Sequence, residues 1–238
     1  MIQVVEVRRI LWPLGAAAVA LLAQSQSQPV AKQPSQPQTP RPKLSDQLPA
    51  QTRPIEFESG GLRFQTLTRN GVTIMFAAVP MQIRDYSILQ VAVTNGSPLA
   101  WTFKPEDFRF ERAQGDSVAA LPARQVVTRM LEHGGRNDVI RLVQTYELTL
   151  YGLSRYKSTN GYEQRRQAAF AEVSNTKLKA AAAASAIAFP TVKLAPGQST
   201  DGALFYATQG RPLGAGRLSI RAAGDTFAFD PIDGHPAK

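Results

Sequence analysis

The side chains able to do acid–base or metal chemistry are few in this chain of 238 residues, and their spacing favours no common catalytic site. The two histidines, His133 and His235, lack both an HExxH pattern and a second ligand at i+4, which a zinc site on a helix requires. Cysteine is absent, which excludes disulfides, thiolate metal sites and cysteine nucleophiles. We therefore expect neither a metal nor a cofactor.

Two other groups of residues resemble catalytic arrangements without completing them. Residues 154–157 fit Ser-x-x-Lys, but the penicillin-binding enzymes that use this motif add a Lys-Thr-Gly strand, which this sequence lacks. Asp107 and Glu111 fall on one face of a predicted strand, where an acid–base pair would need to lie. Arg109 and Arg112 are close to them in sequence and are the partners that we expect for both carboxylates. Both groups therefore favour a protein that is not an enzyme.

Basic residues gather in one part of the chain. Lys and Arg number 27 against 18 Asp and Glu, a net charge of +9. Six cations in and beside predicted helices form the candidate contact surface: Arg155, Lys157, Arg165, Arg166, Lys177 and Lys179. Such a surface suits an anionic membrane or polymer, although a solvated helix face explains the same pattern. Nucleic acid is not expected, because base stacking needs interleaved aromatic side chains.

The N-terminal residues have the pattern of an export signal. Arg8-Arg9 precede the uncharged, mostly apolar residues 10–23, a run shorter than the about 20 residues of a spanning helix. We expect residues 1–23 to act as a signal peptide or, uncleaved, as a short N-terminal anchor. Residues 24–54 are rich in Gln, Pro and Ser and have too little apolar surface to bury, which predicts a disordered linker.

The elements that position these residues are predominantly short strands. Residues 87–110 have the pattern of strand, turn, strand, turn, strand, with Leu89, Val91 and Val93 on one face. Asn70-Gly71 is a hairpin signal between two further alternating runs. Similar alternation recurs near both ends of the predicted domain. Half-buried strands at this spacing predict an all-β sandwich.

A helical block interrupts the strands over about 123–189. Residues 126–131 repeat at helical spacing up to a Gly-Gly pair, and a second helix is expected near 139–151, although TYELTLY also fits a strand. A longer helix is predicted for 162–188, with small side chains suited to close packing. Its apolar stripe contains Phe170, Val173, Ala180, Ala184 and Ile187. Because strand patterns flank the block, we interpret it as an insertion into one domain of residues 55–232.

Two stretches carry a family resemblance. LQVAVTNGSPLAWTFKPEDFRFERAQG and VKLAPGQSTDGALFYA are similar to bacterial secreted immunoglobulin-like domains of unknown function. In those domains a hydrophobic strand ends in an Asn-Gly-Ser turn, a Pro-Glu-Asp-Phe segment follows, and a Leu-x-Pro-Gly turn precedes another strand. The resemblance implies a mainly β fold with an α insertion, namely an immunoglobulin-like β-sandwich interrupted by the helical block. It supplies no catalytic residue.

Together these observations predict an extracytoplasmic module, periplasmic or secreted, that binds or assembles at the bacterial envelope without catalysis. If residues 10–23 are retained, they would anchor it in the inner membrane. The partner would be an envelope protein or an anionic membrane or polymer surface. Two alternatives stay open. One is a hydrolase of envelope polymers that uses Asp107, Glu111 or Ser154, and the other is a structural spacer domain without a ligand.

Overall fold

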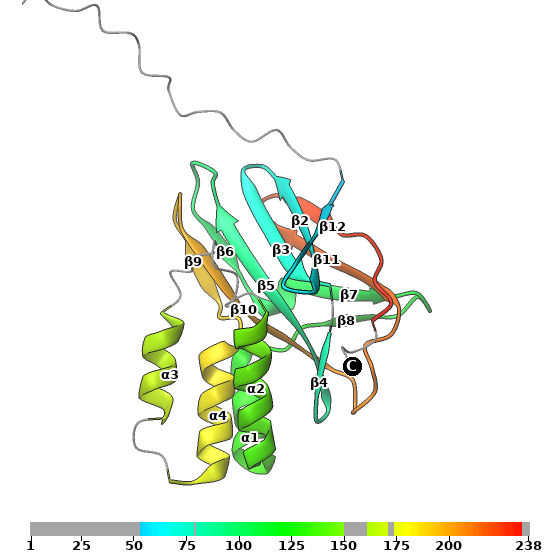
Figure 1. Ribbon diagram of the computed structural model, residues 1–238. Coiled ribbons are helices and arrows are strands. Elements are labelled where there is room, and N and C mark those ends of the chain that lie inside the picture. The colour runs from blue at the N-terminus through cyan, green and yellow to red at the C-terminus, as the bar shows by residue number, and fades with distance from the viewer. Residues whose placement is uncertain (1–52, 79, 150–160, 171–173, 235–238) are drawn as a thin grey trace, which may run out of the picture. The chain divides into compact units, whose positions relative to one another are not determined.

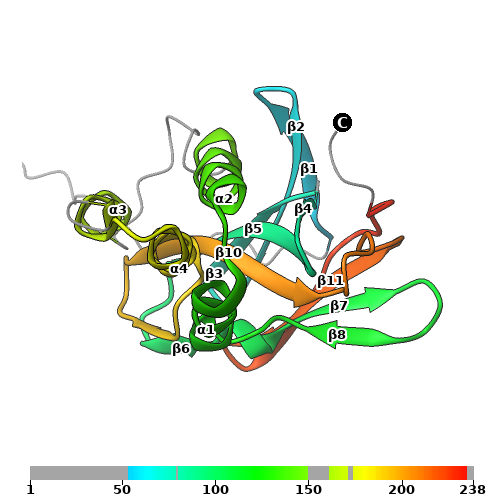
Figure 2. The ribbon, with the colours of Figure 1, turned by 90° about the horizontal axis from the view of Figure 1, so that it is seen from below.

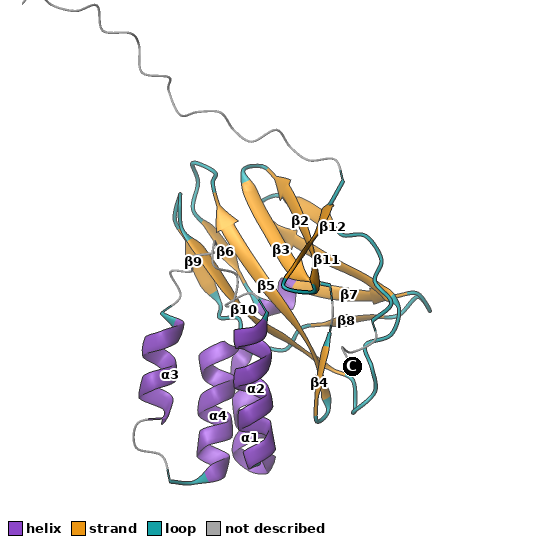
Figure 3. Ribbon diagram, in the orientation of Figure 1, coloured by secondary structure: helices purple, strands orange, loops and turns teal. Residues whose placement is uncertain are grey.

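The computed structural model describes residues 53–78, 80–149, 161–170 and 174–234, which all belong to one compact unit, Lys43–Lys238. The signal or anchor predicted for residues 1–23, and the linker predicted for 24–54 except its last two residues, lie outside the described residues. The described part is mainly β, with several antiparallel sheets and a group of helices (Figures 1 and 3). The predicted class, mainly β with helices between the strands, is confirmed at this level.

One sheet is built around strand β5, and all of its pairings are antiparallel. Its strand order is β1-β2-β3-β5-β10, and the short strand β4 pairs with the first residues of β5. The bounds are β1 Ile55–Ser59, β2 Leu62–Arg69, β3 Val72–Ala77, β4 Met81–Ile83, β5 Tyr86–Asn95 and β10 Ser199–Ala207. Asn70 and Gly71 join β2 to β3 with φ angles of 50° and 73°, as a type I′ turn requires, so the predicted hairpin is confirmed.

A second sheet and a two-stranded ladder complete the β structure of the described residues. The second sheet is also antiparallel, in the order β12-β11-β7-β8. Its bounds are β7 Phe108–Arg112, β8 Ser117–Ala119, β11 Gly216–Ala222 and β12 Asp225–Ala228. Strands β6 Trp101–Phe103 and β9 Val192–Leu194 pair with each other, and the 3₁₀ turn Pro105–Asp107 joins β6 to β7.

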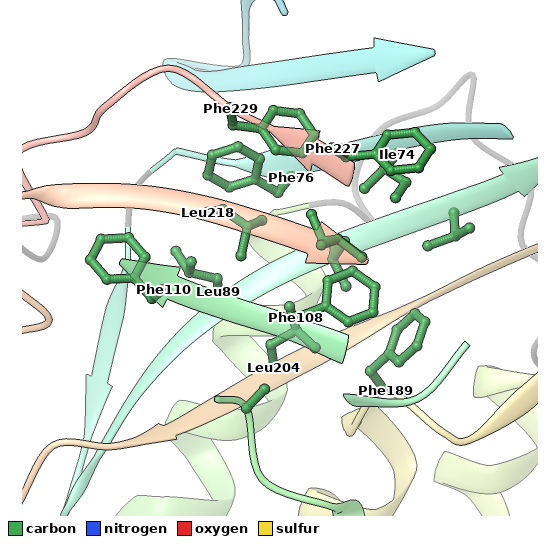
Figure 4. Packing of buried hydrophobic residues seen from close by; sticks show 14 of the residues in the cluster. Ile74, Phe76, Leu89, Phe108, Phe110, Phe189, Leu204, Leu218, Phe227 and Phe229 are labelled. Atoms are coloured by element: carbon green, nitrogen blue, oxygen red, sulfur yellow. The ribbon is translucent and has the colours of Figure 1, made fainter. Parts of the chain in front are cut away.

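The two larger sheets share one hydrophobic core. Inward side chains of β3 and β5 meet those of β7, β11 and β12, and the residues labelled in Figure 4 are all buried. Among them, Phe76 packs edge-on against Phe229 with 4.9 Å between the ring centroids. Leu89, Val91 and Val93 belong to this core, as their alternation predicted. The arrangement is compatible with a β-sandwich.

Strand β5 departs from the predicted half-buried pattern because both of its faces are covered. On the face away from the shared core, Gln90 and Ala92 are each only 1% exposed. On that same face, Ile88 of β5 and Phe205 of β10 belong to a second hydrophobic cluster that includes residues of the helices. The prediction of a strand with one solvated face is therefore wrong for β5.

Four α-helices are described between β8 and β9, and we call them the helical block. Their bounds are α1 Ala123–His133, α2 Arg136–Leu148, α3 Tyr162–Phe170 and α4 Thr176–Ile187. The single helix predicted for 162–188 is wrong, because Asn175 caps a new helix. Its side-chain oxygen accepts hydrogen bonds from the backbone N–H groups of Lys177 at 2.8 Å and Leu178 at 3.4 Å. The side chains of Phe170 and Val173, which belong to the predicted stripe, lie outside the described residues.

Helix α4 lies in the middle of the block, against α1, α2 and α3 (Figure 2). Its buried residues are Ala180, Ala181, Ala183, Ala184, Ala186 and Ile187. Methyl side chains let neighbouring helices come close, and a Cβ placed on Gly134 at the end of α1 would lie 2.5 Å from the Cβ of Ala180. A helix buried on so many sides needs small residues all round, so the predicted stripe describes only part of its contacts.

Both ends of the helical block are bonded to strand β10. The backbone N–H of Leu121, before α1, donates to the carbonyl oxygen of Phe205 at 2.8 Å. The N–H of Phe189, after α4, donates to the carbonyl oxygen of Ala203 at 2.9 Å. These bonds use carbonyl groups on the edge of β10 that faces away from β5, so this part of the sheet edge is covered.

We expect Gly134→Ala to lower the free energy of unfolding by about 1–3 kcal/mol, the usual cost of overpacking. The new methyl group would lie 2.4 Å from the carbonyl oxygen of Met130 and 2.5 Å from the Cβ of Ala180, so α1 and α4 would have to separate. Chemical denaturation of the full chain measures the change. Gly135→Ala is the matched control, because a Cβ there meets nothing closer than 3.5 Å. Equal losses in the two variants would contradict close packing of α1 on α4.

Candidate functional site

The structure separates the six cations predicted as a contact surface into groups with different surroundings. Arg155 and Lys157 lie outside the described residues. The other four lie on two neighbouring helices, Arg165 and Arg166 on α3, and Lys177 and Lys179 in the first turn of α4.

Arg166 is held by carboxylates inside the block. Its guanidinium forms ion pairs with Glu147 of α2 at 3.0 Å and with Glu163 at 3.4 Å. The same group lies 6.0 Å from the ring centre of Tyr162, whose hydroxyl donates to Glu147 over 3.3 Å. Burial, with the nearby Glu147 charge, raises the pKa of Tyr162 above its ordinary value, so this hydroxyl stays protonated. Arg166 thus ties α3 to α2 and is already paired. Arg165, beside it, forms no ion pair with a described carboxylate, and its Nε atom is buried.

Tyr146 extends these polar contacts to the sheet. Its ring lies 4.4 Å from the ring of Tyr162, centroid to centroid, and its hydroxyl donates a hydrogen bond to Asp201 on β10. Tyr146 and Asp201 are both fully buried. A carboxylate removed from water is costly unless it is hydrogen-bonded or paired, so this contact belongs to the docking of α2 on β10.

We expect Arg166→Ala to cost about 1 kcal/mol of unfolding free energy, because it leaves Glu147 and Glu163 close together without their shared cation. Lys177→Ala should change the stability by less than about 0.5 kcal/mol, because Lys177 is exposed and forms no ion pair with a described carboxylate. Thermal and chemical denaturation of both variants test this. A larger loss for Lys177→Ala than for Arg166→Ala would show that the two cations have the opposite roles.

The end of α1 and the starts of α2 and α4 lie toward the bottom of Figure 1. The two lysines belong to the first turn of α4. We call residues 129–141 and 174–179 the basic end. The contact of Gly134 with Ala180 fixes the end of α1 beside the first turns of α4. The neighbouring turn is fixed by Asp138, whose carboxylate accepts from the N–H of Gly135 at 2.7 Å. The structure therefore brings together residues that are about 40 positions apart in the chain.

Cations exceed carboxylates at the basic end. The acidic side chains there are paired: Glu132 with Arg129 at 3.4 Å, and Asp138 with Arg84 at 2.6 Å. Four basic side chains at this end form no ion pair with a described carboxylate, namely Arg136, Arg141, Lys177 and Lys179. Arg136 and Arg141 were missed from sequence, because only the Gly-Gly turn between two predicted helices indicated that they could lie near the lysines.

The carboxylates proposed for a hydrolase have other partners. The Asp107 side chain accepts a hydrogen bond from the backbone N–H of Lys104 at 2.9 Å and so caps the 3₁₀ turn. Glu111 accepts from the Arg217 Nε at 2.7 Å and from the Ser219 hydroxyl at 2.8 Å. These bonds, the arginine's first, hold the pKa of Glu111 below its ordinary value.

The prediction that Arg109 and Arg112 are the partners of Asp107 and Glu111 was wrong. Arg112 pairs with Asp116 at 2.5 Å, and Arg109 forms no ion pair with a described carboxylate. Sequence proximity failed because the neighbour across the sheet, Arg217, belongs to β11. Asp107, Arg109 and Glu111 nevertheless line one open cavity of about 530 Å³ on the outer face of the second sheet, with Arg221 and three hydroxyl side chains.

We expect Glu111 to give the fold a small pH dependence. Because its pKa is lower in the folded protein than in the unfolded chain, its contribution is present above the ordinary carboxyl pKa, about 4.3, and is lost as the pH falls through the folded value. Glu111→Gln should therefore flatten the stability curve below about pH 5, by less than about 1 kcal/mol since the pair is exposed. Denaturation from pH 3 to 7 measures it. Glu106→Gln is the control. If it flattened the stability curve equally, the pH dependence could not be assigned to Glu111.

The structure also describes one of the two histidines and the turn that follows β5. His133 is exposed, with its Nε2 atom 3.5 Å from Glu132, while His235 lies outside the described residues. Asn95, the first residue of the Asn-Gly-Ser turn, is fully buried. Its amide donates to the carbonyl oxygens of Leu99 and Leu194 at 2.7 and 2.9 Å, so it joins the turn after β5 to β9.

Comparison with models of known protein families, with curated proteins and with solved structures finds no match to this chain. Among the helices that the structure describes, none is both long and apolar enough to cross a membrane.

Proposed function

We propose that this chain is an extracytoplasmic module of the bacterial envelope that binds or assembles without catalysis, with the basic end as its partner-binding surface. The observation that carries the proposal is the group of cations there that form no ion pair with a described carboxylate, Arg136, Arg141, Lys177 and Lys179. Cations in excess of the neighbouring carboxylates attract an anionic partner over about the Debye length, roughly 8–10 Å at moderate salt.

The location outside the cytoplasm is supported by the N-terminal pattern. Arg8-Arg9 followed by the apolar residues 10–23 is typical of an export signal. If this segment is retained, it anchors the chain in the inner membrane, and residues 24–54 are the tether between the anchor and the folded part.

The immunoglobulin-like family is part of the same proposal. Its support is two antiparallel sheets over one core, with the Asn95–Ser97 turn following β5 where the resemblance expects it. The helices inserted between β8 and β9 give this module a surface beyond the two sheets.

Hydrolysis of envelope polymers is the weaker proposal for the described carboxylates. A general acid works best with a pKa raised toward the operating pH, whereas the pKa of Glu111 is lowered. Asp107 caps a turn, and Ser154 lies outside the described residues. A peptidoglycan-hydrolysis assay with Glu111→Gln and Asp107→Asn variants addresses this alternative directly.

The binding proposal is tested with the paired substitution Lys177→Gln/Lys179→Gln in the full chain. Each lysine near an anionic surface contributes about 1 kcal/mol, so the loss of two should weaken binding by about 30-fold at low salt. Equilibrium binding to phosphatidylglycerol vesicles and to alginate, an acidic polysaccharide, measures the effect at two salt concentrations.

Arg109→Gln/Arg221→Gln is the matched control, because it removes the same charge from an exposed face of the second sheet. Equal weakening by both paired substitutions would show that the net charge of the protein, and not the position of the two lysines, determines binding. Binding that neither pair nor salt changes would contradict the basic end as the binding surface, and no binding to either probe would favour the spacer alternative.

A further inference from the structure

The basic end also presents exposed aliphatic side chains. Leu131 of α1, Ile140 of α2 and Leu178 of α4 are 40%, 44% and 49% exposed. They are three of the six large hydrophobic side chains that are exposed among the described residues, and the other three lie on β1 and in the turn after β5. Single exposed aliphatic residues are common, but a group at one end of a helical block marks an interaction surface.

All three aliphatic residues lie close to the ends of their helices. Leu131 is two residues before the end of α1, Leu178 is two residues after the start of α4, and Ile140 is four residues after the start of α2. At about 1.5 Å of rise per residue, each Cα lies within roughly 6 Å of its helix end along the helix axis. Interfacial segments enter a bilayer by about 5–10 Å, so end-on contact can bury all three side chains.

Aliphatic and basic residues alternate at this end. Lys177 and Lys179 flank Leu178 directly, and Ile140 lies between Arg136 and Arg141. The long stems of Lys and Arg can run along an apolar surface while the charged groups stay in the headgroup layer. This combination is the usual composition of an element that lies at the surface of an anionic membrane.

Each of two other kinds of partner would contact favourably only the cations or only the aliphatic side chains of the basic end. A soluble polyanion would pair with the cations and leave the aliphatic side chains in water. A second copy of this chain would cover the aliphatic side chains but would bring four cations that pair with no described carboxylate against four more. An anionic bilayer offers phosphate groups to the cations and an apolar layer to the aliphatic side chains.

We propose that the basic end docks on an anionic lipid bilayer, with Leu131, Ile140 and Leu178 entering the boundary between headgroups and acyl chains. This inference rests on the proposed function and names the partner of the same surface.

The absence of cysteine makes a site-specific test possible in the full chain, because one introduced thiol is the only one to react. Leu178→Cys, labelled with an environment-sensitive dye, should show a blue shift of emission on vesicles that contain phosphatidylglycerol. Added salt should reverse the shift, and phosphatidylcholine vesicles should produce none.

Gln114→Cys, in the exposed turn between β7 and β8, is the matched probe. Both labelled proteins keep residues 1–23, so adsorption through that segment acts on both alike. We expect no shift at residue 114. The double variant Leu131→Gln/Ile140→Gln, which keeps every cation, should bind anionic vesicles more weakly with the same salt dependence.

The outcomes separate this inference from the proposed function. If Lys177→Gln/Lys179→Gln weakens binding but the dye at residue 178 stays in water, the partner is bound by charge alone and the bilayer inference is wrong. Equal shifts at residues 114 and 178, or no shift at either, would also overturn it. A shift that needs no vesicles and grows with protein concentration would assign the basic end to contact between copies of the chain.

Discussion

The burial of both faces of the β5–β10 pair is the constraint on which the rest of the structure depends. These strands pair along nine residues of each, from Tyr86 to Thr94 and from Ser199 to Ala207. One face of the pair contributes Leu89 and Leu204 to the core shared with the second sheet, and the other contributes Ile88 and Phe205 to the cluster beneath the helices. Because backbone polar groups are satisfied within the ladder, each face can be covered by apolar side chains. The helical block is thus a second layer of the same fold.

Helix α4 and one buried polar contact determine how that layer is held. The alanines of α4 allow three helices to approach a common centre, where larger side chains would keep them apart. The hydrogen bond from Tyr146 to Asp201 fixes the rotation of α2 on β10, because a buried carboxylate tolerates few positions of its donor. Packing of small apolar groups supplies contact area, and the polar bond selects one arrangement.

Features encoded by local residues could be predicted from the sequence, and those that depend on distant partners could not. Asn70-Gly71 determines its hairpin through its own φ preferences. The break before α4 was missed because the N-cap role of Asn175 was hidden inside a continuous helical pattern. The partner of Glu111 is 106 positions away, so nothing near Glu111 in the sequence indicated Arg217. In the same way Lys177 and Lys179 were predicted as a contact surface, while Arg136 and Arg141 join them only through the antiparallel course of the helices.

The hydrogen bonds of Leu121 and Phe189 to β10 also bear on how such a chain can change over generations. The chain enters and leaves the helical block beside two neighbouring carbonyl groups on one edge of β10, those of Phe205 and Ala203. Turns at the far end of the block can gain or lose residues without moving any strand, since doubling the length of a flexible connection costs only about 0.6 kcal/mol of closure entropy. What must persist is an apolar cover over Ile88 and Phe205. A lineage could therefore remodel the far end of the block, and with it the choice of partner, while the strand framework stays unaltered.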